Sequence, residues 1–183
     1  MEKTANPAPL GLMGFGMTTV LLNIHNAGFF PLGAMVLLMG VFYGGIIQIL
    51  AGLLEYKRGN TFAATAFASY GAFWLTLVGL ILAAKFGWAD ATPAAFMGWY
   101  LFLWGFFTLC MFFGTLRENR CLQTVFLSLT VLFFLLAAAE WAGSPLMGRI
   151  AGVEGIACGF SAICLAMAEV LNEVYERTVL PIG

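Results

Sequence analysis

Residues 4–54 read TANPAPLGLMGFGMTTVLLNIHNAGFFPLGAMVLLMGVFYGGIIQILAGLL and contain no Lys, Arg, Asp or Glu. A helix that crosses the hydrocarbon core of a bilayer needs about 20 predominantly apolar residues, so this run is long enough for two such helices. The natural break is Asn26-Ala27-Gly28 through Pro31, which combines turn-forming residues with a proline. We therefore predict a helix over residues 9–26 and a second over residues 32–54.

Charged residues separate the remaining apolar segments in the same way. Residues 55–59, EYKRG, form a charged turn, and Ser144-Pro145 is typical of an N-cap followed by a first-turn proline. No segment alternates apolar and polar residues as the strands of a membrane barrel do. The sequence predicts an all-α integral membrane protein, with residues 1–183 forming a single domain of six transmembrane helices. The four further spans are expected over residues 62–84, 94–113, 122–139 and 145–171.

The composition excludes several classes of function. The chain is 62% hydrophobic and 9% charged, whereas soluble domains carry about 25% charged residues, so most of the surface must face lipid. A net charge of −1 does not favour a nucleic-acid partner. The four cysteines form no CxxC pair and there is one histidine, so we expect no metal site. No catalytic triad or phosphate-binding loop is present, and we predict no enzymatic activity, no catalytic residues and no cofactor.

The distribution of Lys and Arg predicts the orientation, because cytoplasmic loops carry an excess of these residues. Two positive residues, Lys85 and Arg149, fall on one side of the predicted helices. The other six fall on the side of both termini, which we therefore expect in the cytoplasm: Lys3, Lys57, Arg58, Arg117, Arg120 and Arg177.

Two helices carry stripes of small residues that would allow close helix packing in lipid. The longer stripe consists of Gly148, Gly152, Gly155, Gly159, Ala162 and Ala166, and the shorter one of Gly40, Gly44, Gln48 and Gly52. Such stripes fit packing within the chain, a subunit interface or the wall of a pore, and the sequence leaves all three open.

Ionisable residues are scarce within the spans, which constrains the mechanism. Glu55 and Glu169 lie near the ends of helices, where we expect water to reach them, and His25 ends the first helix. These three are the candidates for a proton-carrying or polar path. Without a basic residue in the middle of a span, any anion would depend on hydroxyl, amide and backbone N–H groups. This favours small solutes with a single charge, carried with or without a proton.

Short motifs along nearly the whole chain resemble one membrane-protein family. The first, Asn6-Pro7-Ala8-Pro9-Leu10-Gly11-Leu12, resembles the signature of the acetate uptake transporter family, in which two prolines flank an alanine just before a helix. Further stretches are similar to that family in the expected order: residues 43–45, 51–56, 59–62, 69–74, 111–116 and 168–173.

The resemblance implies a homo-hexamer in the inner membrane of a bacterial cell, with a separate path for acetate through each six-helix protomer. It also implies a narrow hydrophobic constriction formed by Phe15, Tyr70 and Leu129, and a role for Ala162 in selecting the size of the substrate. Large apolar side chains at a constriction resist wetting, and the Tyr70 hydroxyl could bind a carboxylate.

The signature itself is expected at the cytoplasmic mouth. Two prolines restrict the backbone before the first helix. We expect the segment to fold over the mouth, with Asn6 bonding free backbone groups and with Pro7, Pro9 and Gly11 as further members of the motif.

Three functions remain open on the sequence. The first is transport of acetate, and of succinate or other small carboxylates, by a passive channel or by a proton-coupled symporter. The second is a channel for a small neutral solute such as urea or ammonia, which the absence of buried basic residues suits equally well. The third is a membrane scaffold or sensor, which the very short loops disfavour.

Overall fold

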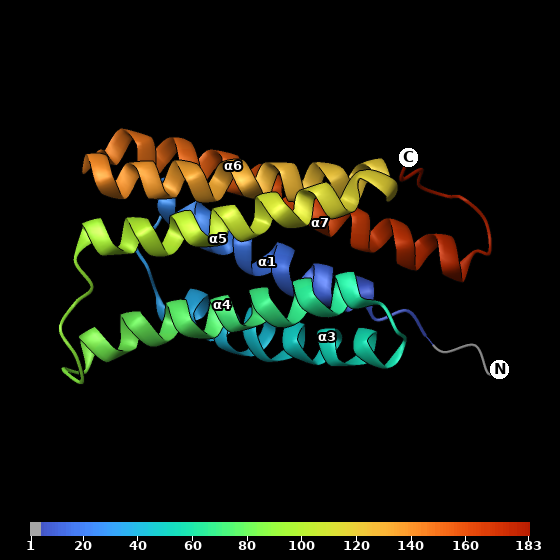
Figure 1. Ribbon diagram of the computed structural model, residues 1–183, viewed down its shortest axis with the longest axis horizontal. Coiled ribbons are helices and arrows are strands. Elements are labelled where there is room, and N and C mark those ends of the chain that lie inside the picture. Colours follow the sequence, from blue (N-terminus) through green and yellow to red (C-terminus); the bar gives the residue numbers. More distant parts are fainter. Residues whose placement is uncertain (1–4) are drawn as a thin grey trace.

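The computed structural model describes residues 5–183, and all of its regular elements are helical. The all-α prediction is thereby confirmed for these residues, whereas Lys3 lies outside them. The helices run side by side along one axis as a bundle (Figure 1). The elements are α1 (Ala8–Asn26), α2 (Ala34–Met39), the π-helix η1 (Gly40–Ile47), α3 (Gln48–Lys57), α4 (Thr61–Lys85), α5 (Ala94–Gly114), the 3-10 helix η2 (Thr115–Arg117), α6 (Arg120–Ala142) and α7 (Pro145–Val174).

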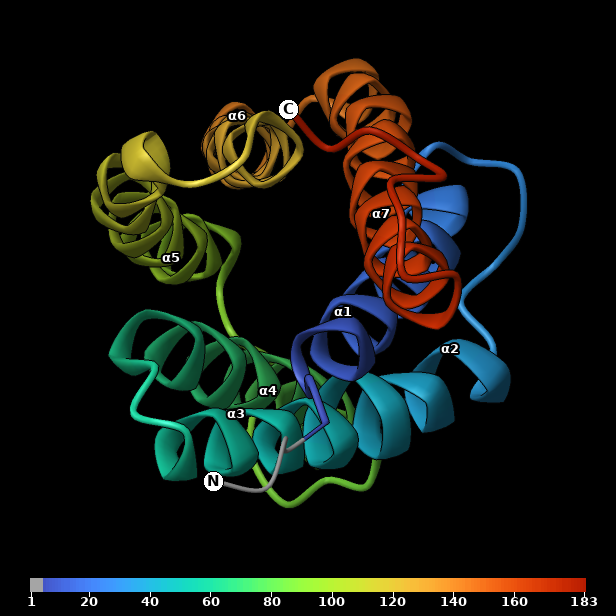
Figure 2. The same cartoon turned by 90° about the vertical axis from the view of Figure 1, so that its right-hand side faces the viewer.

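Five helical segments of the described chain are long and apolar enough to cross a membrane. They span Ala34–Lys57, Thr61–Lys85, Ala94–Arg117, Arg120–Ala142 and Pro145–Val174. The first helix, α1, has 19 residues but is not among them. Its last turns contain Asn23, His25 and Asn26, which lower its mean hydropathy. Despite this, α1 lies inside the bundle, between α7 and the α3–α4 pair (Figure 2).

The second predicted helix differs from its expected form. It begins at Ala34 rather than residue 32, because Gly33 is still extended, and it runs without a break to Lys57. Glu55 to Lys57, predicted as a charged turn, form its last turn, and the chain reverses at Arg58-Gly59, where Gly59 has a φ of +76°. Its central part, η1, is a π-helix, a form that occurs frequently at functional sites.

Small residues bring α1 and α7 into backbone contact. A Cβ added at Gly159 would lie 2.8 Å from the carbonyl oxygen of Gly16, and one added at Gly152 would collide with the backbone of Ala27. Ala162 and Ala166 are fully buried in the same face of α7. The longer small-residue stripe therefore packs within the chain over most of its length, and glycine is needed where the two backbones meet.

Both ends of the described chain lie at the same end of the bundle (Figure 1). Beyond α7 the tail folds back, because the Asn172 side chain accepts hydrogen bonds from the backbone of Val179 and Leu180. The carbonyl of Ile182 then accepts a bond from the backbone N–H of Cys121, in the first turn of α6. The tail thus joins the end of α7 to the start of α6.

Substitution of Gly152 tests the α1–α7 contact. We expect Gly152→Ala to lower the free energy of unfolding by about 1–3 kcal/mol, because the added methyl group overpacks a backbone contact. Gly148→Ala is the matched control in the same helix, since a Cβ there meets nothing within 4 Å. Denaturant unfolding in detergent micelles measures both, and equal stability of the two variants would contradict this packing.

Candidate functional site

Three cavities follow one another along the bundle and share their lining residues. The largest, about 220 Å³, opens at the end where the described chain begins and ends, and we call it the mouth. Leu12, Ala66, Phe67 and Phe126 join it to a second cavity of about 20 Å³. Phe15, Tyr70 and Leu129 join the second cavity to a third of about 30 Å³.

The lining of this series comes mainly from three helices, α1, α4 and α6, all of which begin at the mouth. On each helix the lining side chains recur every three or four residues, so one face of the helix follows the cavities. These side chains are Leu12, Phe15 and Thr19 on α1, Phe67, Tyr70 and Phe73 on α4, and Phe126, Leu129 and Leu132 on α6.

Phe15, Tyr70 and Leu129 line both inner cavities, at the junction between them. All three side chains are buried, and the rings of Phe15 and Tyr70 have their centroids 6.1 Å apart. A cavity must have a volume of about 10–15 Å³ to hold one water molecule. The two inner cavities, at about 20 and 30 Å³, are therefore water-sized, and a larger solute requires side chains to rotate. The structure thus brings together the three residues that the family resemblance selected.

The Tyr70 hydroxyl does not point freely into the cavity. It donates a hydrogen bond of 3.0 Å to Thr108 Oγ1, and Thr108 in turn donates to the carbonyl of Trp104. The hydroxyl proton of Tyr70 is therefore used in a bond from α4 to α5, and that of Thr108 in a bond within α5. In this arrangement Tyr70 can accept a hydrogen bond from a solute but does not offer the free donor that we expected for a carboxylate.

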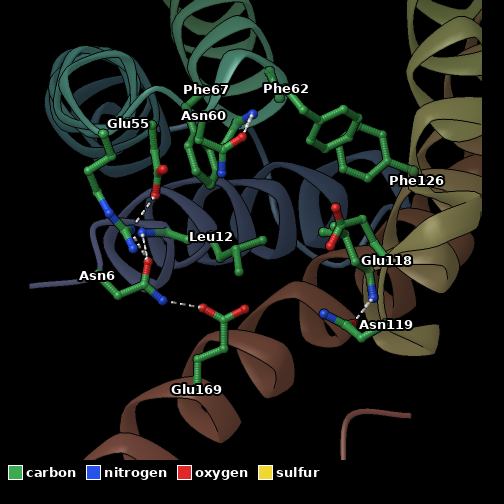
Figure 3. A pocket seen from close by; sticks show the side chains of 15 residues that line it. Asn6, Leu12, Glu55, Asn60, Phe62, Phe67, Glu118, Asn119, Phe126 and Glu169 are labelled. Carbon is green, nitrogen blue, oxygen red and sulfur yellow. Dashed lines mark hydrogen bonds and ion pairs between the residues drawn. The ribbon is translucent and has the colours of Figure 1, made fainter.

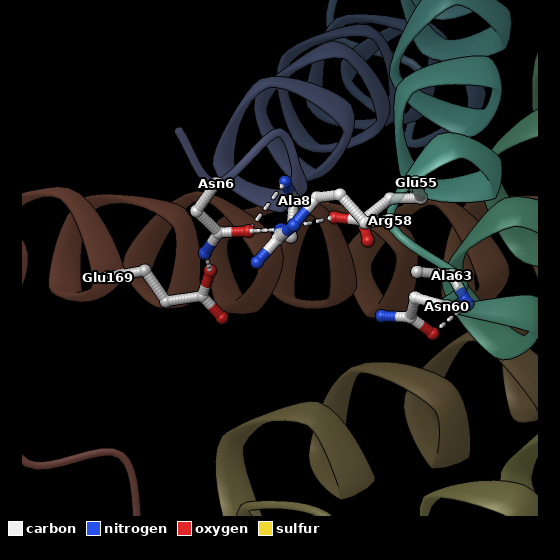
Figure 4. A network of polar contacts seen from close by, with 7 residues as sticks. All are labelled: Asn6, Ala8, Glu55, Arg58, Asn60, Ala63 and Glu169. Carbon is white, nitrogen blue, oxygen red and sulfur yellow. Dashed lines mark hydrogen bonds and ion pairs between the residues drawn. The ribbon is translucent and has the colours of Figure 1, made fainter. Parts of the chain in front are cut away.

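A network of polar side chains closes one side of the mouth (Figure 4). Asn6 is at its centre. Its Nδ2 donates to Glu169 at 3.0 Å, while its Oδ1 accepts from Arg58 at 2.7 Å and from the backbone N–H of Ala8 at 3.2 Å. Arg58 also pairs with Glu55 at 3.2 Å. One amide thus connects the segment before α1 to α7 and to the turn between α3 and α4.

The two carboxyl groups of this network differ in their access to water. Glu55 was expected near water, but its side chain is 1% exposed, and Arg58, at 36%, covers it. The expectation failed because α3 packs against α1 and α4, which the charge pattern of the sequence does not show. Glu169 is half-buried, and its carboxyl group faces the mouth (Figure 3). Glu118 is the third carboxyl group in the lining of the mouth.

The other residues of the signature begin α1. Pro7 is its N-cap residue and Pro9 lies in its first turn, where a missing N–H costs nothing. A Cβ at Gly11 would lie 2.6 Å from the ring of Phe67, so glycine allows α1 to approach α4 at the junction between the mouth and the second cavity.

The N-termini of the lining helices add partial positive charge at the mouth. Asn60 caps α4 by accepting from the N–H of Ala63, and Asn119 caps α6 by accepting from the N–H of Leu122. Both cap residues line the mouth, and so does Ala8 at the start of α1. Helix N-termini carry partial positive charge and attract anions. The mouth therefore combines three helix N-termini and Arg58 with three carboxyl groups.

His25 and Ala162, two residues that the sequence analysis selected, do not line the three cavities. His25 is at the opposite end of the bundle, with its Nδ1 2.9 Å from the carbonyl oxygen of Phe30. Ala162 is fully buried in the same apolar core as Phe15 and Leu129, but it does not line any of the three cavities. A larger side chain at 162 would act on the cavities through the packing of α7.

Gln48 is a lining residue that the sequence interpretation treated only as part of a packing stripe. It begins α3 immediately after the π-helix, is buried, and lines the second cavity with Phe15 and Leu129. A glutamine within a highly apolar span was the available signal, since a buried amide must find a hydrogen-bonding partner.

This arrangement suits passage of a small solute better than bond chemistry. The mouth offers polar groups and helix N-termini, whereas the inner cavities are almost entirely apolar. A charged solute entering them would lose its hydration with few donors in return. The geometry therefore selects for small size and low charge.

Comparisons with known proteins agree with this geometry. A family model described as the GPR1/FUN34/yaaH family matches residues 1–182. The succinate-acetate/proton symporter SatP of Escherichia coli strain K12 is 65% identical over 181 residues, covering 99% of this chain and 96% of that protein. A solved structure described as the bacterial acetate channel SatP superposes with a TM-score of 0.98 at 65% identity, covering 99% of this chain and 100% of the other. Ammonia transport outward protein 2 of Saccharomyces cerevisiae is 36% identical over 170 residues, covering 88% of this chain and 60% of that protein.

Proposed function

The chain belongs to the GPR1/FUN34/yaaH family, and from this premise we propose that it transports acetate, together with succinate and other small carboxylates, across the cell membrane. The observation that carries the proposal is the series of three cavities along α1, α4 and α6, in a chain 65% identical to a succinate-acetate/proton symporter. The solute enters at the mouth and passes Phe15, Tyr70 and Leu129, which form the constriction.

The proposed setting is the inner membrane of a bacterial cell, crossed six times with both termini in the cytoplasm. Five segments are apolar enough to cross, and α1 lies alongside them inside the bundle. The positive-inside rule supports this orientation. The helix ends on the side of the mouth carry or adjoin Lys57, Arg58, Arg117, Arg120 and Arg177, whereas Lys85 and Arg149 are on the other side.

We propose a homo-hexamer, each protomer with its own path; native mass spectrometry of the detergent-solubilised protein would exclude it by finding another subunit number. The relatives are described as a symporter, a channel and a transport protein, which supports transport without an enzymatic step or a cofactor.

Uptake of labelled acetate into proteoliposomes tests the function. We expect protein-dependent uptake that reaches equilibrium without a pH gradient and exceeds it when the interior is more alkaline. Acetic acid also crosses lipid on its own and is trapped by the gradient, so protein-free vesicles are the control. A correctly assembled sample without uptake above that control, in both conditions, would refute acetate transport.

Leu129 tests the constriction. We expect Leu129→Ala to raise the uptake of propionate relative to acetate about tenfold, because one methylene group in a tight apolar site is worth about 1–3 kcal/mol of discrimination. Leu103→Ala is the control, since Leu103 is 62% exposed on the outer face of α5. An unchanged ratio of propionate to acetate uptake in Leu129→Ala would show that Leu129 is not part of the constriction.

Glu169 and Glu55 are proposed to carry protons at the mouth, and His25 at the opposite end. Glu169 faces the mouth and is held by Asn6, so it can give a proton to an entering carboxylate. We expect Glu169→Gln to weaken the pH dependence of the initial uptake rate, whereas Glu176→Gln, in the exposed tail, keeps the wild-type profile. A wild-type profile in Glu169→Gln would exclude this role.

A neutral-solute channel is the second candidate function, because one relative is described as an ammonia transport protein. The two candidates differ in competition. Unlabelled acetate at high concentration slows labelled acetate uptake through a carboxylate path, whereas it leaves the movement of ammonia or urea through a neutral-solute channel unchanged.

A further inference from the structure

Gln48 contributes an amide side chain to the lining of the second cavity. Its side chain is 1% exposed, and the residues around that cavity are otherwise apolar apart from Tyr70. The π-helix that ends at Ile47 sets its position, because a π turn holds an extra residue and so changes which face the next residue occupies.

The carbonyl oxygen of this amide lacks a partner. Gln48 Oε1 is buried, and nothing among residues 5–183 donates a hydrogen bond to it. A buried polar group without a partner destabilises the folded protein. Two hydroxyl groups from the same region of the bundle are already in use, since Tyr70 donates to Thr108, and Thr18 donates to the carbonyls of Gly14 and Phe15. The oxygen is therefore free to accept a hydrogen bond from a donor outside the chain.

The chemistry of the solute decides which species can provide that donor. A carboxylate anion has only acceptors, and no Lys or Arg lines the two inner cavities to compensate its charge. A neutral carboxylic acid has one O–H and one carbonyl oxygen. The O–H can donate to Oε1 while the Gln48 amide N–H donates to the acid carbonyl, so the two groups pair through two hydrogen bonds.

We propose that Gln48 binds the carboxyl group of the neutral acid at the constriction, so that the transported proton crosses as part of the solute. The inference rests on the proposed carboxylate transport and names its permeating species. At the mouth the carboxylate takes up one proton, and at the far end the acid releases it. One proton therefore moves with each acid, and no net charge crosses the membrane.

Exchange of labelled acetate in proteoliposomes tests the species. With total acetate fixed and the same pH on both sides, we expect the protein-dependent rate to fall between pH 5 and pH 7 in proportion to the neutral acid. We also expect the rate of net uptake to be unchanged by an imposed membrane potential. A rate that rises with an inside-positive potential, or that follows the anion concentration, would overturn the inference.

A pair of amide substitutions tests the residue. We expect Gln48→Met, of similar size but without the amide, to lose at least tenfold in protein-dependent exchange. Gln123→Met keeps the wild-type rate, because Gln123 lines none of the three cavities; its amide accepts from Arg120 and donates to the backbone carbonyl of Glu118. Exchange by folded Gln48→Met within twofold of wild type would refute the role of Gln48.

Different results would refute carboxylate transport and passage of the neutral acid at Gln48. Absence of wild-type acetate uptake removes the carboxylate function and this inference together. Wild-type uptake that responds to membrane potential, or that tolerates Gln48→Met, removes the inference alone. The potential measurement needs no variant, so it decides the species even if Gln48→Met does not fold.

Discussion

The cost of an unpaired polar group in lipid is the constraint on which this structure depends. Where water is absent, each buried N–H, hydroxyl or charge needs a partner within the protein. Thr18, Thr76 and Thr130 accordingly donate to carbonyls in the preceding turn of their own helices. The buried Glu55 has Arg58 beside it. Among the described residues, the buried side-chain oxygens without a partner are Gln48 Oε1, Glu55 Oε2 and Glu154 Oε2, and of these residues only Gln48 lines an inner cavity.

The same constraint explains the division of the path into two chemical zones. Helix N-termini, caps and ionisable side chains gather at the mouth, where water can reach them. Aromatic and aliphatic side chains fill the interior, where Phe15, Phe73 and Trp74 surround the third cavity. A solute thus exchanges water for polar protein groups first and meets the apolar section only afterwards. This order separates recognition of the carboxyl group from selection by size.

Charge and hydropathy in the sequence were sufficient to predict an all-helical chain and the approximate position of each helix, because charged residues cannot remain within lipid. They could not predict the π-helix at Gly40–Ile47, since a local change of register leaves hydropathy unaltered. The burial of Glu55 also escaped prediction, because it depends on how α1 and α4 pack against α3. Phe15, Tyr70 and Leu129 came from family resemblance alone; composition would have assigned Phe15 and Leu129 to ordinary packing or to lipid contact.

The backbone contact between α1 and α7 limits how the path can move. Gly16 and Gly159 let the backbones of these two helices approach each other closely, and Phe15 is the neighbour of Gly16 on α1. A motion of α1 away from α7 would have to break that contact, whereas rotation of Phe15 or Leu129 would not. Rotation of a side chain rearranges far fewer atoms than a domain motion, which takes microseconds to milliseconds, so rotation favours fast passage. A path without two exclusive facing states works equally well in both directions, and the cell would set the flux only by how quickly it consumes or produces the acid.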